Sequence, residues 1–149
     1  MAKKYKLTDE CIAIGNKKLY RIEALKDFSN INKGDKGGFI ESEYNLSQEN
    51  NCWVYGDANI SGDANISGDA KVYGNACVFG DAYIASNSDY IVFKNWWSSG
   101  RYFTWTRSNN MWKVGCFYGT GEELIAKAYK DSELSGREYE KIVKYVESI

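Results

Sequence analysis

The chain of 149 residues is long enough for one compact unit or two small ones with a real hydrophobic core. Its hydrophobic fraction of 44% and aromatic fraction of 15% are those of a folded protein, which excludes an intrinsically disordered chain. The net charge of −1 is unevenly spread, because residues 1–37 carry +4, residues 38–89 carry −7 and residues 90–149 carry +2. Since the middle is acidic, nucleic acid wrapped around it is not an expected partner.

No apolar run approaches the length of a membrane span, and the first residues are not followed by a signal-type apolar stretch. We therefore expect a cytoplasmic protein with no membrane partner. The cysteines lack CxxC spacing and mostly have apolar neighbours, which predicts reduced, buried thiols rather than disulfides or a metal site. They are Cys11, Cys52, Cys77 and Cys116.

The N-terminal part alternates enough to predict strands at Tyr5–Leu7 and Leu19–Leu25. Between them, Thr8–Cys11 has the composition of a helix N-cap, so a short helix is expected there. A loop rich in Asn, Gly, Lys and Asp follows at residues 29–38. Residues 1–37 are predicted to form a cap on the segment that comes next.

That next segment, residues 50–85, repeats a six-residue phrase: Gly, Asp or Asn, then a small residue, any residue, Ile or Val, and any residue. A fixed period of six predicts a parallel β-helix, with three hexads to a coil of eighteen residues. Alternation puts the small and the β-branched residue on the inside, and the Gly-Asp pair supplies a turn. The register continues backwards through Leu46 and Ile40, in the alanine position.

This repeat resembles the hexapeptide-repeat, left-handed parallel β-helix family. Three stretches of the sequence are similar to the opening of β-solenoid proteins found in phages, prophages and enterobacteria, some of them labelled as transferases. These stretches are Leu19–Ile22, Gly37–Glu43 and Cys52–Ala58. The resemblance implies a capped solenoid of phage or prophage origin in a bacterial cytoplasm. It implies no particular reaction.

Three aromatic strands are predicted after the repeats, at Tyr90–Lys94, Arg101–Arg107 and Met111–Tyr118. Capping boxes at Thr120 and Ser135 then open two helices. The buried face of the second helix is predicted to hold Tyr139, Ile142, Val143 and Val146. This βββαα unit resembles a small C-terminal domain of uncharacterised phage proteins.

The predicted fold class is therefore mainly β. It consists of an N-terminal β cap (residues 1–37), a short left-handed parallel β-helix (residues 38–89) and a C-terminal α+β domain of βββαα form (residues 90–149).

Catalytic chemistry is restricted by the absence of histidine from the chain. Hexapeptide-repeat proteins are often acyltransferases that use a histidine as general base, and Ser-His and Cys-His nucleophile pairs need one as well. No catalytic residue, cofactor or metal site is predicted. The repeated aspartates are interpreted as solvated turn residues.

Two sets of side chains are candidates for binding. The first is an aromatic face of the repeats, where Trp53 and Tyr55 are expected above Lys71 and Tyr73; the N-terminal segment, a second subunit or another partner would cover it. The second set is Arg101, Trp105 and Arg107, which share one side of a strand and suit stacking and phosphate pairing. The alternative is that Trp105 lies in a core beneath the helices, with the arginines at its rim.

The predicted function is that of a non-enzymatic, phage-associated binding or scaffold protein, a homo-oligomer (dimer or trimer) with a host protein or a small nucleotide as candidate partner. A role in counter-defence against host immunity is one refinement. The alternatives are a degenerate acyltransferase that binds acyl-coenzyme A and a protein that binds a nucleotide signal.

Overall fold

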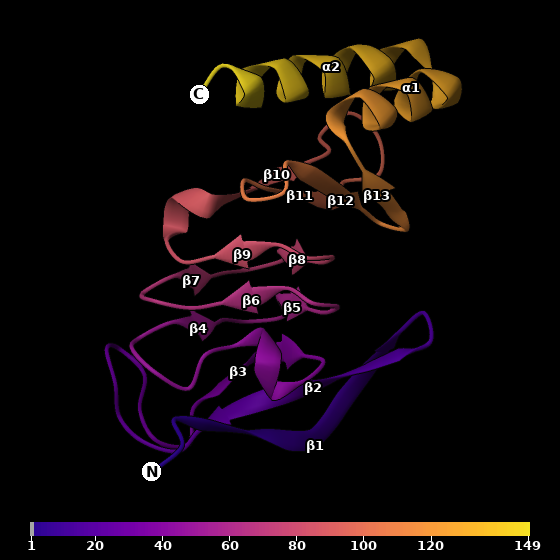
Figure 1. Ribbon diagram of the computed structural model, residues 1–149. Helices are drawn as coiled ribbons and strands as arrows, with labels where there is room; N and C mark the ends of the chain where they lie inside the picture. Colours follow the sequence, from indigo (N-terminus) through magenta and orange to yellow (C-terminus); the bar gives the residue numbers. More distant parts are fainter. Residues whose placement is uncertain (1) are drawn as a thin grey trace.

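The computed structural model describes residues 2–149; Met1, the first residue of the predicted cap, lies outside the described residues. The elements follow one another along a single direction (Figure 1). A long hairpin stands at the N-terminal end, short stacked strands form the middle, and a second sheet lies beyond them. Two helices cover the C-terminal end, so the chain termini lie at opposite ends of the molecule.

The N-terminal strands are β1 (Tyr5–Ile14), β2 (Lys17–Ala24) and β3 (Lys36–Ile40), paired antiparallel in that order. The short helix expected at Thr8–Cys11 is wrong, because these residues belong to β1. The Thr8 hydroxyl, which would have capped a helix, donates instead to the Arg21 carbonyl of the neighbouring strand at 2.8 Å. The register of β1 against β2 shifts at this point.

The hexads form six strands of two residues each, which pair in parallel eighteen residues apart: β4 with β7, β5 with β8 and β6 with β9. We call these strands and their turns, residues 50–85, the hexad stack. The glycine that opens each turn has positive φ, as the turn chemistry predicts. The strands are β4 (Trp53–Val54), β5 (Asn59–Ile60), β6 (Asn65–Ile66), β7 (Lys71–Val72), β8 (Cys77–Val78) and β9 (Tyr83–Ile84).

The predicted fold class, with its left-handed parallel β-helix, is wrong. The structure is mainly β, but it is built of several small mixed and antiparallel sheets and two helices. Turns at every sixth residue leave only two residues of each hexad in strand pairing, and the pairs are distributed over three sheets. One of these sheets is mixed, since β5 and β8 continue the antiparallel strands β1, β2 and β3.

The inside of the hexad stack holds the residues that alternation placed there. The alanines and the Ile or Val residues of all five regular hexads are fully buried, as are Cys52 and Val54 of the looser copy. Leu46 and Ile40 are buried as well, but not in the alanine position: Leu46 pairs with Ile66 and Ile40 pairs with Ile60. The spacing of twenty residues in these pairs reflects extra residues ahead of the repeats, around a 3₁₀ turn at Glu43–Asn45.

The C-terminal sheet has four antiparallel strands rather than three: β10 (Tyr90–Lys94), β11 (Tyr102–Thr106), β12 (Met111–Val114) and β13 (Phe117–Gly119). The predicted third strand is broken because Gly115, with φ of +55°, turns the chain back on itself. A 3₁₀ turn at Asn87–Asp89 leads into β10.

The helices are α1 (Gly121–Asp131) and α2 (Glu133–Glu147). Thr120 caps α1 in a capping box with Glu123, which confirms that prediction. The second predicted box is wrong: Ser132 caps α2, and its hydroxyl accepts from the Ser135 backbone N–H at 3.0 Å. No helix within residues 2–149 is long and apolar enough to cross a membrane.

The C-terminal sheet separates two hydrophobic cores. Tyr90 and Val92 of β10 pack against the core of the hexad stack. Phe103 and Trp105 of β11 face the other way and pack with residues of the two helices. Successive strand residues point to opposite faces, so one sheet closes the stack and also carries the helices.

The last layer of the stack would present unpaired backbone N–H groups, as any edge strand does. Side chains that follow the stack in the sequence accept hydrogen bonds from five of them, at 2.7–3.3 Å. The pairs are Lys71 with Asn87, Tyr73 with Tyr90, Cys77 with Thr104, Tyr83 with Ser108 and Ala85 with Asp89. This end of the stack is therefore closed to further strands.

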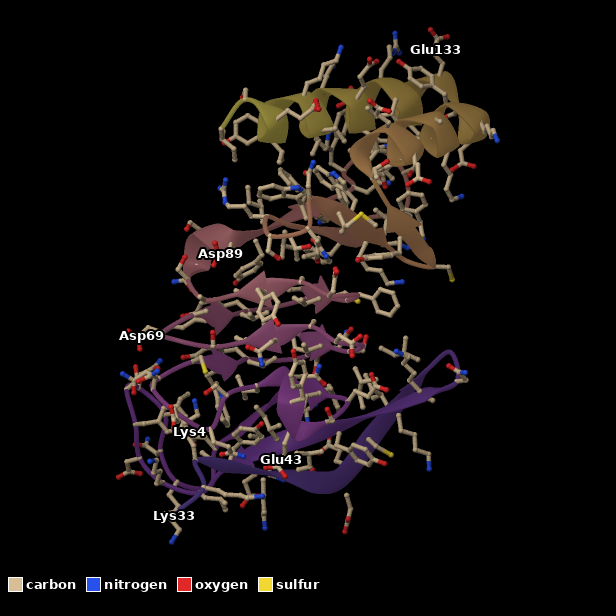
Figure 2. All side chains as sticks on the ribbon, viewed as in Figure 1. Lys4, Lys33, Glu43, Asp69, Asp89 and Glu133 are labelled. Atoms are coloured by element: carbon tan, nitrogen blue, oxygen red, sulfur yellow. The ribbon has the colours of Figure 1, made fainter. Side chains whose placement is uncertain are left out.

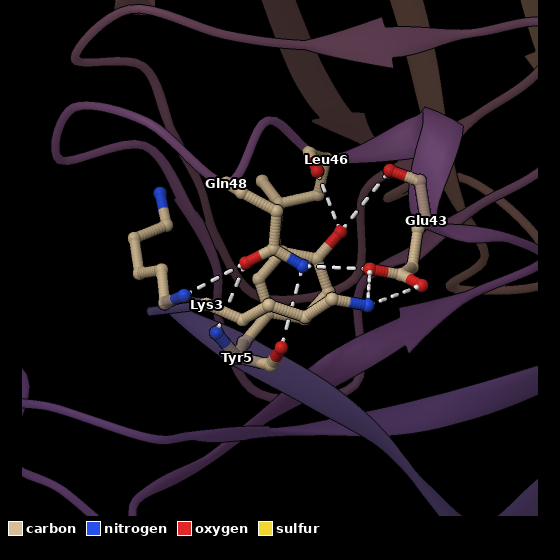
Figure 3. Close-up of polar contacts among 6 residues, drawn as sticks. Lys3, Tyr5, Glu43, Leu46 and Gln48 are labelled. Atoms are coloured by element: carbon tan, nitrogen blue, oxygen red, sulfur yellow. Dashed lines mark hydrogen bonds and ion pairs between the residues drawn. The ribbon is translucent and has the colours of Figure 1, made fainter. Parts of the chain in front are cut away.

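The first layer is closed by the N-terminal segment. Lys4, labelled in Figure 2, is fully buried, and its ammonium donates to the carbonyl of Cys52 at 2.7 Å and to the carbonyls of Glu49 and Asn50 at 3.3 Å. The buried Tyr5 hydroxyl donates to the carbonyls of Leu46 and Glu43 (Figure 3).

The Gln48 side chain tightens this closure, because its oxygen accepts from the backbone N–H of Lys4 at 2.8 Å and of Tyr5 at 3.2 Å. Burial, with Glu43 nearby, raises the pKa of Tyr5 well above its usual range. The phenol is thus held neutral and acts as a donor.

The hydrogen bond between Thr104 and Cys77, which helps to close the last layer of the stack, can be tested. Thr104 is 1% exposed, and its hydroxyl accepts from the Cys77 N–H at 3.0 Å. Thr104→Val keeps the shape but leaves that N–H unpaired, so the free energy of unfolding should fall by about 1–3 kcal/mol. Thr104→Ser keeps the hydroxyl and should lose less. Urea unfolding of both variants measures this, and a valine variant as stable as the serine variant would contradict it.

Tyr5 also makes stability depend on alkaline pH. In the unfolded chain its phenol ionises near a pKa of about 10, whereas the raised pKa keeps it protonated in the fold. The folded state then binds more protons, so this contribution is complete below about pH 10 and is lost as pH rises beyond it. Tyr5→Phe should be less stable at pH 7 and should lose less stability than the unaltered protein between pH 9 and 11. Urea unfolding measures the free energy of unfolding at each pH. An equal loss of this free energy in both proteins between pH 9 and 11 would contradict the expectation.

Candidate ligand-binding site

A cavity of about 380 Å³ lies in the C-terminal part, between the sheet and the two helices. It falls within the usual size range of small-molecule sites. Its walls come from the turn before β11, from β12 and β13, from α1 and from the start of α2. We call it the C-terminal pocket; the residues that line it are Asn95, Ser98, Ser99, Arg101, Val114, Phe117, Leu124, Lys127, Ala128, Asp131, Ser132, Ser135 and Tyr139.

Two cationic side chains, Arg101 and Lys127, border this pocket. The Arg101 guanidinium lies directly against Gly115: a β-carbon on that glycine would come within 2.5 Å of Nη1. Both cationic residues are exposed, and neither side chain takes part in an ion pair or hydrogen bond with any residue in the described part of the chain. Their charge is therefore available to a ligand.

The start of α2 adds hydroxyl groups to the pocket. The Ser132 oxygen accepts from the Ser135 N–H, and the Ser135 oxygen accepts from Trp97 Nε1 at 3.0 Å. Deeper in the wall, the hydroxyl of Tyr139 accepts from Asn95 Nδ2 at 3.4 Å. Burial raises the pKa of Tyr139, so its phenol is neutral at physiological pH and keeps its proton as a donor.

The residues predicted as a second binding set do not come together. Arg101 lies just before β11 and borders the pocket, whereas Arg107 lies just after β11, over the ring of Trp105 at 5.1 Å. Nε of Arg107 donates to the Ser88 carbonyl at 3.0 Å. Trp105 is 4% exposed and belongs to the core beneath the helices, as the alternative interpretation had it. The five residues of β11 separate the two arginines, so lying on the same side of this strand does not bring their side chains into one site.

The predicted aromatic face is partly covered. Trp53 is 1% exposed because Tyr5 and Phe28 pack against it, so the N-terminal segment, one of the covers considered from the sequence, covers this end of the face. Tyr55 is half-buried, donates to the Asn30 side chain and stacks on Tyr73 with ring centroids 4.4 Å apart.

Tyr73 itself remains 49% exposed. It borders an open groove with Ile91, Val92 and the exposed Tyr102, and Lys71 is half-buried in the adjacent strand. The exposed part of the predicted face is therefore the Tyr73 end.

The four thiols differ in their exposure to solvent. All four cysteines are free, but only Cys52 and Cys77 are shielded from solvent; Cys11 and Cys116 are exposed, which corrects the expectation that they are buried. Burial raises the pKa of Cys52 and of Cys77, so both are thiols rather than nucleophilic thiolates. The turn aspartates are exposed, and residues 2–149 contain no cluster of side chains suited to hold a metal ion.

Lys4 is the polar residue that sequence reasoning missed. Burial lowers its pKa, while the nearby Cys52 opposes that shift, and its ammonium also lies 3.4 Å from the Cys52 sulfur and 5.0 Å from the centre of the Phe28 ring. Lysine is almost never fully buried unless it is paired. No pattern in the basic N-terminal sequence distinguishes Lys4 from its exposed neighbour Lys3, since only the fold brings the carbonyls to it.

Comparison with known proteins finds similarity over a short part of the chain. No protein-family model matches the chain. An Escherichia coli (strain K12) protein described as the uncharacterized acetyltransferase YdcK is 41% identical over 61 residues, 36% of this chain. The chain spans 19% of the length of that relative. This similarity fits a transferase-like hexapeptide-repeat family.

Proposed function

We propose that this protein is a non-enzymatic binding protein that holds a small ligand in the C-terminal pocket. The observation that carries the proposal is the pocket itself: about 380 Å³, with two uncommitted cationic side chains and five hydroxyl groups at its wall. Concave sites with a few convergent polar groups are where proteins bind small molecules. The hexad stack, closed at both ends, serves as the rigid support.

Binding without catalysis is favoured by the side chains that the chain offers. It has no histidine, so an acyl-transfer base of the usual kind is missing. The shielded thiols Cys52 and Cys77 have raised pKa values and are poor nucleophiles. The pocket supplies hydrogen-bond donors, two cationic groups and one carboxylate, a set suited to the recognition of a ligand.

A second candidate is a degenerate acyltransferase that retains a site for acyl-coenzyme A. The observation in its favour is the similarity to a relative described as an uncharacterized acetyltransferase. Phage origin and a counter-defence role remain predictions from the family resemblance, as do a host protein partner and a bacterial cytoplasmic location.

An acetyl-transfer assay separates the two candidates. The purified protein, incubated with acetyl-coenzyme A and a panel of amine and sugar acceptors, should release no free coenzyme A thiol above the buffer control. A thiol-reactive dye measures the release. Acceptor-dependent release would contradict the non-enzymatic function, and thermal stabilisation by coenzyme A without release would favour the degenerate acyltransferase.

We further propose that copies of this chain associate through the Tyr73 end of the aromatic face. Support comes from Tyr73 and Tyr102, 49% and 43% exposed, beside the half-buried Ile91 and Val92. Large exposed aromatic side chains grouped in this way mark interaction surfaces. Tyr55, stacked beneath Tyr73, holds that ring in place.

Charge placed on this face should break the assembly. Tyr55→Arg with Tyr73→Arg should lower the mass measured by light scattering to that of a single chain, because two like charges would meet across the interface. Tyr145→Arg is the control, since Tyr145 is 57% exposed on α2, away from the stack. An unchanged mass in the double variant would reject this face as the subunit interface.

A further inference from the structure

The positive charges around the C-terminal pocket outnumber the negative ones. Arg101 and Lys127 bring two positive charges, and Asp131, one turn after Lys127 on α1, brings one negative charge. Asp131 forms no ion pair with Lys127 within residues 2–149. The pocket therefore has a net positive charge together with one free carboxylate.

Three of the hydroxyl groups around this pocket have hydrogens that they do not donate within the described residues. The oxygens of Ser132, Ser135 and Tyr139 each accept a hydrogen bond, from Ser135 N–H, Trp97 Nε1 and Asn95 Nδ2. Their own O–H groups donate to no atom of the described residues. Three hydroxyl hydrogens and two cations thus face one cavity, which is a donor set suited to an oxyanion.

The start of α2 fixes the position of the two serine hydroxyl groups. Ser132 is the N-cap of α2 and also the C-cap of α1, so the partial charges of the two helix ends oppose one another there and the side chains carry the preference for an anion. Trp97, whose indole donates to Ser135, packs edge-on against Tyr139 with ring centroids 4.9 Å apart. These contacts hold the hydroxyl groups in position before a ligand arrives, which lowers the entropy cost of binding.

We infer that the C-terminal pocket binds a phosphate monoester whose other part carries hydroxyl groups, a sugar phosphate or a mononucleotide. The phosphate lies between Arg101, Lys127 and the serine hydroxyls at the start of α2. Asp131 accepts from a sugar hydroxyl, which an inorganic anion lacks. The inference rests on the proposed function and names its ligand class.

Geometry and size favour this class over others. The guanidinium of arginine binds phosphate oxygens in pairs, and a bare anion would leave Asp131 facing like charge. A cavity of about 380 Å³ holds a molecule of the size of a mononucleotide and is too small for a nucleic acid chain. Because Arg101 and Lys127 are exposed, each contact is screened by salt, so affinity should fall as ionic strength rises.

Calorimetric titration of the full-length protein with AMP, ribose 5-phosphate, inorganic phosphate and adenosine tests the inference. At constant ionic strength AMP and ribose 5-phosphate should bind, and adenosine should bind at least about tenfold more weakly because it lacks the charged group. AMP binding with no ribose 5-phosphate binding would assign the ligand to mononucleotides, and the reverse would assign it to sugar phosphates.

The arginine is tested by a matched pair of variants. Arg101→Gln should weaken the binding of both esters by about tenfold or more. Arg107→Gln is the control, because Arg107 has the same charge at the other end of β11 but is bonded to Ser88 and lies outside the pocket. Equal losses in the two variants would mean a general effect of charge and would overturn the assignment to this pocket.

The carboxylate is tested separately. Asp131→Asn should weaken the binding of ribose 5-phosphate but not that of sulfate, because the sugar has hydroxyl hydrogens to donate to the carboxylate and sulfate has none. If Asp131→Asn weakens the binding of neither ligand, the proposed role of Asp131 is overturned. Failure of every phosphate to bind the folded protein would overturn this inference alone, whereas coenzyme A release in the acetyl-transfer assay would overturn the proposed function alone.

Discussion

The structure depends on one constraint: a row of short parallel strands leaves backbone N–H groups unpaired where the row ends. Each such buried group left without a partner would cost about 1–3 kcal/mol, and exposed ones would recruit another strand. In the last layer, side chains such as Thr104 and Tyr90 accept from these groups. In the first layer, Lys4 and Tyr5 donate to carbonyls. The ends of the molecule are therefore needed to complete its middle.

This closure also explains where the C-terminal pocket lies. The face of β11 that carries Thr104 turns toward the hexad stack, so its neighbours Phe103 and Trp105 must face the helices. The helices cover those aromatic side chains but leave a gap near the start of the strand, beside Arg101. The pocket thus follows from the packing of one sheet against two hydrophobic cores. The strands and helices that line it lie at the end of the molecule away from the N-terminal hairpin (Figure 1).

Sequence reasoning succeeded where a local pattern is sufficient. Inward residues such as Ala70 and Val72, the glycine turns and the Thr120 cap follow from alternation, φ preference and local hydrogen bonding. It failed where the partner is distant. The hydroxyl of Thr8 bonds Arg21 of the neighbouring strand rather than capping a helix. Of the pocket, only Arg101 could be nominated, because Lys127 and Tyr139 reach it from helices packed over the sheet.

The sequence by itself determined the period of six, the residues buried inside the repeats and the place of the first helix, because these depend on contacts within a few residues. Only the tertiary structure decided that the strand pairs divide into several small sheets, that Lys4 is buried and that a cavity opens between the sheet and the helices. Those features need groups far apart in the chain to meet. Lys4 and Cys52, separated by 48 residues, are one example.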